Sequence, residues 1–273
     1  MRSLEGKVAF ITGAGRGMGR ADAVRLAEAG VDIIALDVDG ELPFIRYVQP
    51  KPEDLEETVA LVEARGRRIV ARSGDVRDLE GMRELLAEAT EELGGIDIVV
   101  ANAGVCTPAT WDNITSEQFQ FTMDVNVTGV WNTVTASAPY LIERGGGSVI
   151  LMSSYAGKKV QPFMLHYTAS KHAVTGMTRA FAAELGKYDI RVNSIHPGGV
   201  NTPMASGDSN GMRSALQEAG EATPSLMGMA TPFLPRHMAE PEEIADTIVF
   251  LASDAARHIT AEHISMDGGA HWY

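Results

Sequence analysis

The chain has 273 residues, and 23 lysines and arginines against 36 aspartates and glutamates give a formal net charge of −13 at pH 7. This acidic balance argues against a nucleic-acid binder, which needs basic side chains to neutralise phosphates. The hydrophobic fraction of 45% is typical of a globular domain, and the single cysteine, Cys106, excludes an intramolecular disulfide. No apolar run reaches the roughly 18 residues of a membrane-spanning helix, and the first residues lack an apolar signal-peptide core, so we expect a cytoplasmic protein.

Short apolar runs alternate with longer helical patterns. Strands are expected at 7–12, 31–38, 68–76, 96–101, 148–153, 189–196 and 259–266. Helices are expected at 17–30, 54–65, 79–93, 116–144, 164–187 and 241–253. Alternation of this kind is typical of βαβ units, and near-continuous apolar strands are typical of a parallel sheet covered on both faces. We therefore predict a single domain over residues 1–273, an α/β three-layer αβα Rossmann fold with a doubly wound parallel sheet of about seven strands. A (β/α)8 barrel is the alternative, but the chain has too few strands for it.

Two stretches interrupt the alternation. Residues 39–52 contain three prolines, and residues 203–235 are rich in Gly, Met, Ser and Pro. Long irregular segments of compact domains are commonly binding loops or lids. Both stretches follow strands that should end at the ligand-binding edge of the sheet. We therefore predict an insert at about 39–52 and a substrate lid at about 203–235, whose methionines favour an apolar substrate.

A glycine-rich segment, TGAGRGMG at 12–19, follows the first strand and opens the first helix. Its glycines permit a tight turn and a close backbone approach to a pyrophosphate at the positive end of the helix. Asp37 ends the second strand, where a carboxylate would accept hydrogen bonds from an adenosine ribose and repel a 2′-phosphate. The sequence thus favours NAD over NADP, although Arg16 is a basic group that would attract a phosphate.

Tyr167 and Lys171 lie four residues apart on a predicted helix, so their side chains project from one face. A free tyrosine, with a pKa of about 10, is a poor base near neutrality. A neighbouring ammonium favours the phenolate and lowers that pKa. We expect Tyr167 to take a proton from an alcohol as hydride leaves for nicotinamide, while Lys171 also holds the nicotinamide ribose. Ser154 follows a strand end, where its hydroxyl would bind the substrate oxygen.

Other polar residues predict no further chemistry. The pairs His166/His172 and His258/His263 lack the spacing of two ligands on one helical face, and no metal site is expected. Cys106 follows the fourth strand near the expected cleft, and we interpret it as a buried spectator thiol rather than a reactive one.

Taken in order, these motifs resemble those of the short-chain dehydrogenase/reductase family over almost the whole chain. The residues that carry the resemblance are 12–19, Asp75-Val76, ANAG at 101–104, Asn126, Ser154, YTASK at 167–171, Pro197-Gly198 and Thr202. The resemblance implies a sheet order of 3-2-1-4-5-6-7 and a homotetramer built on the two long helices. Ala101 departs from the family's usual Asn, at a position that mainly supports the central strand.

The motifs and the resemblance together define the expected site. The catalytic residues would be Ser154, Tyr167, Lys171 and Asn126, with Asn126 holding a water that relays protons from Lys171. The cofactor contacts would be Gly13, Arg16, Gly17, Met18, Gly19, Asp37, Val38, Asp75, Val76, Asn102, Ala103, Gly104, Tyr167, Lys171, Pro197, Gly198, Val200 and Thr202.

The insert permits a narrower comparison. With its flanks at 52–55 and 62–69, it is similar to that of the carveol-dehydrogenase-like subfamily. Members of that subfamily are associated with mycofactocin as electron acceptor and hold NAD very tightly. The similarity implies an insert that covers the adenosine half of NAD and slows its exchange. An ordinary surface loop is the alternative.

The sequence therefore predicts an enzyme, an oxidoreductase that transfers a hydride between NAD and an apolar, alicyclic or terpenoid secondary alcohol or its ketone. A 3-oxoacyl-type ketoreductase using NADPH is a second possibility, separable by its dinucleotide preference and its thioester substrates. A non-catalytic NAD-binding regulator is a third, although such a protein has no chemical need for Ser154, Tyr167 and Lys171 together.

Overall fold

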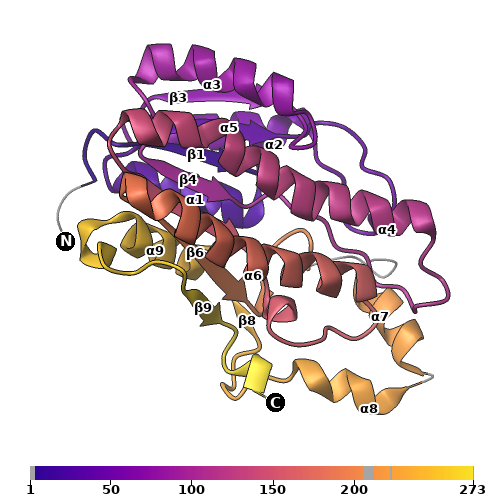
Figure 1. The fold of residues 1–273 in the computed structure, drawn as a ribbon. Coiled ribbons are helices and arrows are strands. Elements are labelled where there is room, and N and C mark those ends of the chain that lie inside the picture. Colours follow the sequence, from indigo (N-terminus) through magenta and orange to yellow (C-terminus); the bar gives the residue numbers. More distant parts are fainter. Residues whose placement is uncertain (1–3, 206–211, 222, 273) are drawn as a thin grey trace.

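The computed structural model describes residues 4–205, 212–221 and 223–272. Its main sheet has seven strands, all parallel, in the order β3-β2-β1-β4-β5-β6-β9 (Figure 1). These strands are β1 (Val8–Thr12), β2 (Asp32–Asp37), β3 (Ile69–Ser73), β4 (Ile98–Ala101), β5 (Gly147–Met152), β6 (Ile190–Pro197) and β9 (His263–Met266). The predicted sheet order is confirmed. The sequence did not predict β7 (Gly199–Val200) and β8 (Met238–Ala239), which form a separate two-stranded sheet.

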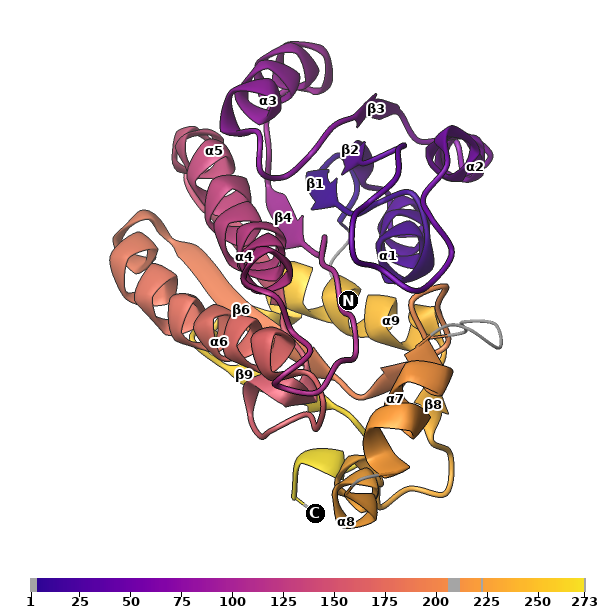
Figure 2. The same cartoon turned by 90° about the vertical axis from the view of Figure 1, so that its right-hand side faces the viewer.

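Helices cover both faces of the sheet, as Figure 2 shows in an end-on view. One layer holds α1 (Gly17–Glu28), α2 (Pro52–Glu63) and α9 (Pro241–Ala252). The other holds α3 (Leu79–Leu93), α4 (Ser116–Met123), α5 (Gly129–Glu143) and α6 (Leu165–Leu185). Short 3-10 turns are η2 (Tyr155–Gly157), η3 (Gly186–Tyr188), η5 (Asp254–Ala256) and η6 (Ala270–Trp272). The three-layer prediction is confirmed.

The continuous apolar strands reflect two hydrophobic clusters, one on each face of the sheet. Along β1, Val8 and Phe10 pack into one cluster, and Ala9 and Ile11 pack into the other. Because successive side chains of a strand point to opposite faces, a strand buried on both faces must be apolar throughout. This pattern is why the strands could be predicted from short runs.

One predicted helix, over 116–144, is interrupted. Between α4 and α5 the chain forms a π-helical turn, η1 (Asp124–Thr128), which contains Asn126. A π turn accommodates one extra residue within a helix, and such turns are common at functional sites. The residues of η1 include no Gly or Pro that would mark a break, so the sequence pattern gave no sign of it.

The two irregular stretches differ from each other. Residues 39–52 contain no helix or strand before α2, as predicted. The stretch 203–235 was expected to be irregular, and that expectation was wrong, because it contains α7 (Met212–Glu221), α8 (Pro224–Met227) and the 3-10 turn η4 (Gly228–Ala230). Residues 206–211 and 222 of the predicted lid lie outside the described residues. Pro at the first position of α8 favours helix initiation there.

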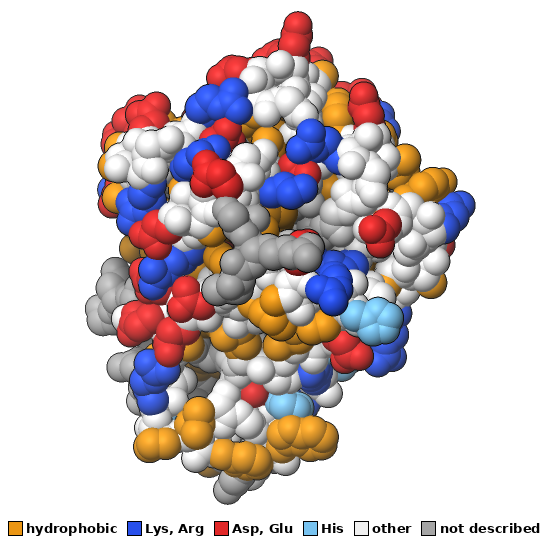
Figure 3. Space-filling view, turned by 90° about the vertical axis from the view of Figure 1, so that its left-hand side faces the viewer, with side chains coloured by type: hydrophobic (Ala, Val, Ile, Leu, Met, Phe, Trp, Pro, Cys, Tyr) orange, Lys and Arg blue, Asp and Glu red, His pale blue; other side chains and the backbone are white. Residues whose placement is uncertain are grey.

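The surface carries both signs of charge. On the face shown in Figure 3, Lys and Arg side chains are interspersed with Asp and Glu, and hydrophobic side chains gather at the lower end. Ion pairs such as Arg65 with Glu28 and Arg67 with Glu5 join side chains of opposite charge that are distant in the sequence. The described residues on this face therefore form no basic patch for a nucleic-acid backbone. Within the described ranges, no helix combines the length and apolar character needed to cross a membrane.

Candidate active site

A cavity opens at the carboxyl ends of the strands, where the chain order reverses between β1 and β4. Ligands of doubly wound sheets bind in the crevice at such a switch point. The predicted cofactor contacts that line the cavity are Gly13, Arg16, Gly17, Met18, Asp37, Val38, Asp75, Val76, Asn102, Ala103, Gly104, Tyr167, Lys171 and Thr202. The fold therefore brings together at one site most of the residues singled out in the sequence.

Four other predicted contacts are not among the described residues that line the cavity. An added Cβ at Gly19 would lie 1.9 Å from the carbonyl oxygen of Gly13, so this glycine allows α1 to pack against the loop. Gly198 backs onto Asp267, with an added Cβ 2.9 Å from its Cα. Val200 is buried in a core cluster, and Pro197 is buried at the end of β6. These four residues shape the backbone around the cavity.

Several residues that line the cavity were not predicted from the sequence. They are Leu42, Tyr47, Pro50, Gly74, Val105, Val125, Met152, Ser153, Pro203 and Met204. Three of them, Leu42, Tyr47 and Pro50, belong to the insert. Its predicted place at the rim was the available signal, but nothing in the sequence indicated which of its side chains turns inward.

The glycine loop leaves the start of α1 open toward the cavity. Gly13 has φ of 67°, and an added Cβ would lie 2.8 Å from the Cα of Ala103. Arg16 occupies the N-cap of α1 and makes no side-chain capping hydrogen bond, and the first turn contains no acidic residue. The first N–H groups of the helix are therefore left for an anion, which the helix dipole also favours.

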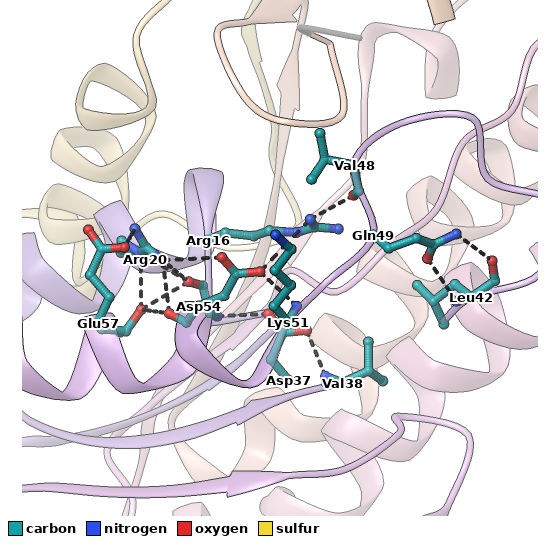
Figure 4. Close-up of polar contacts among 12 residues, drawn as sticks. Arg16, Arg20, Asp37, Val38, Leu42, Val48, Gln49, Lys51, Asp54 and Glu57 are labelled. Carbon is teal, nitrogen blue, oxygen red and sulfur yellow. Dashed lines mark hydrogen bonds and ion pairs between the residues drawn. The ribbon is translucent and has the colours of Figure 1, made fainter. Parts of the chain in front are cut away.

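Asp37 closes the cavity on the β2 side (Figure 4). One carboxylate oxygen accepts a hydrogen bond of 2.7 Å from the N–H of Gly15, and the other accepts one of 2.8 Å from the N–H of Val38. Burial raises the pKa of Asp37, and these two N–H donors oppose that effect. The carboxylate thus lies beside the glycine loop, where a ribose would meet it.

Arg16 faces the insert (Figure 4). Its Nη1 donates a hydrogen bond of 2.7 Å to the carbonyl oxygen of Val48, and its guanidinium lies 5.9 Å from the centre of the Tyr47 ring. The same Nη1 is 4.0 Å from a carboxylate oxygen of Asp54 in α2. Arg16 therefore joins the glycine loop to the insert.

The insert also contacts the opposite side of the cavity. The hydroxyl of Thr107, after β4, donates a hydrogen bond of 2.8 Å to the carbonyl oxygen of Phe44, and the Phe44 and Phe121 ring centres are 5.8 Å apart. Within the insert, the side chain of Gln49 exchanges two hydrogen bonds with the backbone of Leu42. Tyr47 is 9% exposed. The insert is thus tied to the glycine loop at one end and to the loop after β4 at the other.

Ser154, Tyr167 and Lys171 meet at the ends of β5 and α6. The Tyr167 hydroxyl is hydrogen-bonded to the side chain of Ser154. The Nζ of Lys171 donates a hydrogen bond of 2.9 Å to the carbonyl oxygen of Met152 and lies 5.5 Å from the centre of the Tyr167 ring. An alcohol oxygen beside Tyr167 would be within reach of two hydroxyl groups.

The pKa values of Lys171 and Tyr167 are both shifted by burial, and the shift of Tyr167 differs from the expectation. Burial lowers the pKa of Lys171 to about 8. Burial also raises the pKa of Tyr167, and the hydrogen bond with Ser154 opposes this only in part. The predicted lowering of the Tyr167 pKa by Lys171 is therefore wrong for the chain by itself, because desolvation of the phenolate outweighs the stabilising contacts.

A rise in pH should stabilise the fold through Lys171. Its folded pKa of about 8 lies below the usual 10.5, so between these pH values the folded protein has released a proton that the unfolded chain still binds. We expect the free energy of unfolding to gain on the order of 2 kcal/mol between about pH 7.5 and 9.5, relative to the Lys171→Met variant. Urea denaturation of both nucleotide-free proteins measures this difference. An equal pH dependence in the two would contradict the lowered pKa of Lys171.

Asn126 lies outside the cavity wall. Its side-chain oxygen accepts a hydrogen bond of 2.8 Å from the N–H of Val105, and its Nδ2 donates to the carbonyl oxygen of Val105 (2.9 Å) and to the hydroxyl of Ser170 (3.0 Å). These contacts join η1 to the loop after β4 and to α6. The Asn126 side chain thus positions the loop, and a water relay at this residue would have to use its backbone.

Cys106 is buried, and its sulfur lies 3.2 Å from that of Met164. Burial raises the pKa of this thiol to about 12. A thiol that stays protonated is a poor nucleophile, which agrees with a spectator role.

A seven-stranded parallel sheet with a glycine loop after β1 and a Ser, Tyr and Lys set after β5 and on α6 defines a class of oxidoreductases. A family model described as Enoyl-(Acyl carrier protein) reductase matches residues 13–271. The chain belongs to the short-chain dehydrogenase/reductase family.

Solved structures and curated relatives narrow the comparison. A short-chain dehydrogenase from Mycobacterium paratuberculosis, crystallised bound to NAD, is 59% identical with a TM-score of 0.97, over 99% of this chain and 100% of that one. Carveol dehydrogenase from Mycobacterium avium, in complex with NAD, is 40% identical with a TM-score of 0.90, over 99% of both chains. The (−)-trans-carveol dehydrogenase of Rhodococcus erythropolis is 38% identical over 98% of this chain and 99% of its own.

Proposed function

We propose that the protein is an NAD-dependent dehydrogenase of apolar secondary alcohols, alicyclic or terpenoid and similar to carveol. The observation that carries the proposal is the meeting of Tyr167 with Ser154 and Lys171. Tyr167 and Lys171 line a cavity that also contains an uncapped helix start and Asp37, and the buried Ser154 lies next to Ser153 of the cavity wall. The two carveol dehydrogenases, at 38% and 40% identity, support the substrate class.

The residues present fit NAD. The uncapped N–H groups of α1 suit a pyrophosphate, and the Asp37 carboxylate suits the ribose hydroxyls. Among the described residues, the side-chain oxygen of Asn102 is buried without a hydrogen-bond partner, in a side chain that lines the cavity. When bound, NAD supplies the acceptor for a hydride and a positively charged ring that favours a nearby phenolate.

The chain's own residues then handle the proton. Ser154 would hold the alcohol oxygen through its hydroxyl. In the oxidation direction Tyr167 has to act as the phenolate, which the positive charges of bound NAD and Lys171 favour, and its Oη takes the alcohol proton as the carbonyl forms. Lys171, held by the carbonyl oxygen of Met152, provides a positive charge beside the Tyr167 ring. In the reverse direction, Tyr167 returns the proton to the ketone oxygen. Its raised pKa suits this donor role.

The surroundings of the site favour an apolar substrate. Met152 and Met204 line the cavity, and the Cys106–Met164 pair lies buried nearby. Thioether and thiol side chains adapt to irregular apolar shapes. Among the described residues that line the cavity, Arg16 is the one arginine, and the insert holds it, so these residues form no arginine cluster for a phosphate or carboxylate of a substrate.

We further propose that the insert retains NAD. Its contacts with Arg16 on one side and with Thr107 and Phe121 on the other extend from the glycine loop to the loop after β4. An enzyme that retains its nucleotide must be reoxidised in place, so an external electron acceptor, of the mycofactocin type, is part of this proposal.

The association of subunits is also proposed. Trp131, 52% exposed, and Ile142 present large apolar side chains on α5, and Leu165 does so on α6. Exposed apolar side chains on neighbouring long helices suit the helix-mediated homotetramer implied by the resemblance.

A substrate panel tests the function. We expect the NAD-loaded protein to oxidise carveol and other cyclic secondary alcohols. Protein stripped of NAD and reloaded with NADP should do so at rates at least about 100-fold lower, because Asp37 repels a 2′-phosphate. A 3-oxoacyl thioester should not be reduced. Reduction of that thioester with NADPH would favour the ketoreductase, and hydride transfer to no member of the panel despite bound NAD would favour a non-catalytic regulator.

A further inference from the structure

A line of polar side chains crosses the sheet below Ser154. Ser194 and His196 lie two residues apart on β6, so they point to the same face of the sheet. His263 on the edge strand β9 is the register partner of Ser194. Ser194 and His196 are fully buried, where unpaired polar groups would be costly.

These side chains form a continuous chain of hydrogen bonds that ends on Ser154. The Nδ1 of His196 lies 2.8 Å from the carbonyl oxygen of Ser154, and its Nε2 lies 2.8 Å from the hydroxyl of Ser194. The same hydroxyl lies 2.8 Å from the Nδ1 of His263. The two imidazole rings are edge to face, with centres 5.5 Å apart.

The partners fix every proton in this chain. A carbonyl oxygen only accepts, so the Nδ1 of His196 must carry the proton. Burial lowers the pKa of His196 to about 3, so the ring is neutral and its Nε2 accepts from Ser194. The hydroxyl of Ser194 then accepts from the Nδ1 of His263. All three donors therefore point toward Ser154, an arrangement in which each hydrogen bond polarises the next.

The short turn that contains Ser154 is fixed at both ends. Ser154 is the N-cap of η2, and its carbonyl oxygen also accepts from the N–H of Gly157. Beyond the turn, the Nζ of Lys158 donates to the carbonyl oxygen of His263 and to the hydroxyl of Ser265, each at 2.6 Å. Hydrogen bonds with residues of β6 and β9 thus fix the position of the turn.

We propose that His196, locked in one tautomer by Ser194 and His263, is a positioning residue that fixes Ser154 against Tyr167. The inference rests on the proposed function, in which Ser154 holds the substrate oxygen. Loss of the donor at Nδ1 leaves the Ser154 carbonyl oxygen with the N–H of Gly157 as its remaining donor, and lets the hydroxyl move away from the position where it would hold the alcohol oxygen. Misplacement by about 1 Å can cost up to about 100-fold in rate.

Two substitutions separate positioning from simple packing. In His196→Asn the amide nitrogen takes the place of Nδ1 and still donates to Ser154, whereas in His196→Gln the amide reaches Ser194 instead. With carveol added to the NAD-loaded protein, we expect the single-turnover rate at about 340 nm to fall roughly 10- to 100-fold in His196→Gln and at most about threefold in His196→Asn, with NAD content unchanged in both. His172, an exposed histidine whose Nδ1 lies 2.9 Å from the carbonyl oxygen of Thr168, supplies the matched control His172→Gln, which should match wild type. Equal rates in the two His196 variants would overturn the proposal.

A second measurement does not depend on turnover. Two-bond 1H–15N spectra of ring-labelled histidine should show His196 as the Nδ1–H tautomer from about pH 6 to 9, because the Ser154 carbonyl oxygen accepts that proton. In Ser194→Ala, His263 loses the acceptor of its Nδ1 proton and should show a mixture of tautomers. A mixture in the wild-type protein would overturn the hydrogen-bond chain. If the protein oxidises no alcohol but shows the fixed tautomer, the proposed function and the positioning role are refuted. The chain of hydrogen bonds would still be supported.

Discussion

Replacing Tyr167 with Phe should lower the rate of alcohol oxidation by about 10³-fold while the NAD content stays that of the wild type. The substitution removes only the Oη atom, which is hydrogen-bonded to Ser154 and is the proton acceptor of the proposed reaction. The ring and its packing beside Lys171 remain, so the cavity keeps its shape. Single-turnover absorbance on addition of carveol, with the nucleotide quantified after denaturation, measures both quantities.

The control for this variant is Tyr188→Phe. Tyr188 is 38% exposed, on the η3 turn after α6, and is not among the described residues that line the cavity. It should oxidise carveol at the wild-type rate. Wild-type turnover in Tyr167→Phe would refute the assignment of the general acid/base, and loss of NAD from it would show that the ring is needed for binding instead.

Opening the insert should accelerate the release of NAD. Tyr47→Ala removes a buried ring at the cavity wall, and we expect the dissociation rate to rise about 100-fold, because burial of such a side chain contributes roughly 2–3 kcal/mol. Thr107→Val removes only the hydrogen bond to Phe44 at the other end of the insert, with an expected rise of about fivefold. Exchange of bound NAD for isotopically labelled NAD, followed by mass spectrometry, measures both rates.

Glu41→Gln is the matched control, since Glu41 is exposed within the same insert. It should leave the exchange rate unchanged. If Tyr47→Ala retained NAD as long as the wild type, the insert would be an ordinary surface loop, and rapid exchange in the wild type would remove the retention proposal altogether.

The sequence predicted the sheet well because its information is local. Strands such as β1 are apolar on both faces, and the glycine loop directly joins β1 to α1, so the strands and the site could be inferred from neighbouring residues. The order of the strands in the sheet was implied by the family resemblance. Tyr167 and Lys171 lie about one helical turn apart, and this spacing is enough to predict that they share one side of α6.

What could not be predicted depends on distant contacts. The π turn around Asn126 depends on packing against the loop after β4 and against α6. The link from His263 to Ser154 requires the register of β6 with β9, which no local pattern contains. The rise in the Tyr167 pKa follows from burial by residues far apart in the sequence, so the i,i+4 spacing with Lys171 suggested the wrong direction.

The most direct test of NAD retention and of the proposed function is the carveol experiment of the substrate panel, performed on protein purified without added nucleotide. Carveol is added alone, and absorbance at about 340 nm is followed. The account predicts a single turnover, with about one reduced nucleotide formed per chain and further turnover only when an artificial electron acceptor is supplied. Nucleotide-free protein that reduces added NAD in many turnovers would contradict retention of the cofactor, and NAD-loaded protein that forms no reduced nucleotide with any cyclic alcohol would contradict the proposed function itself.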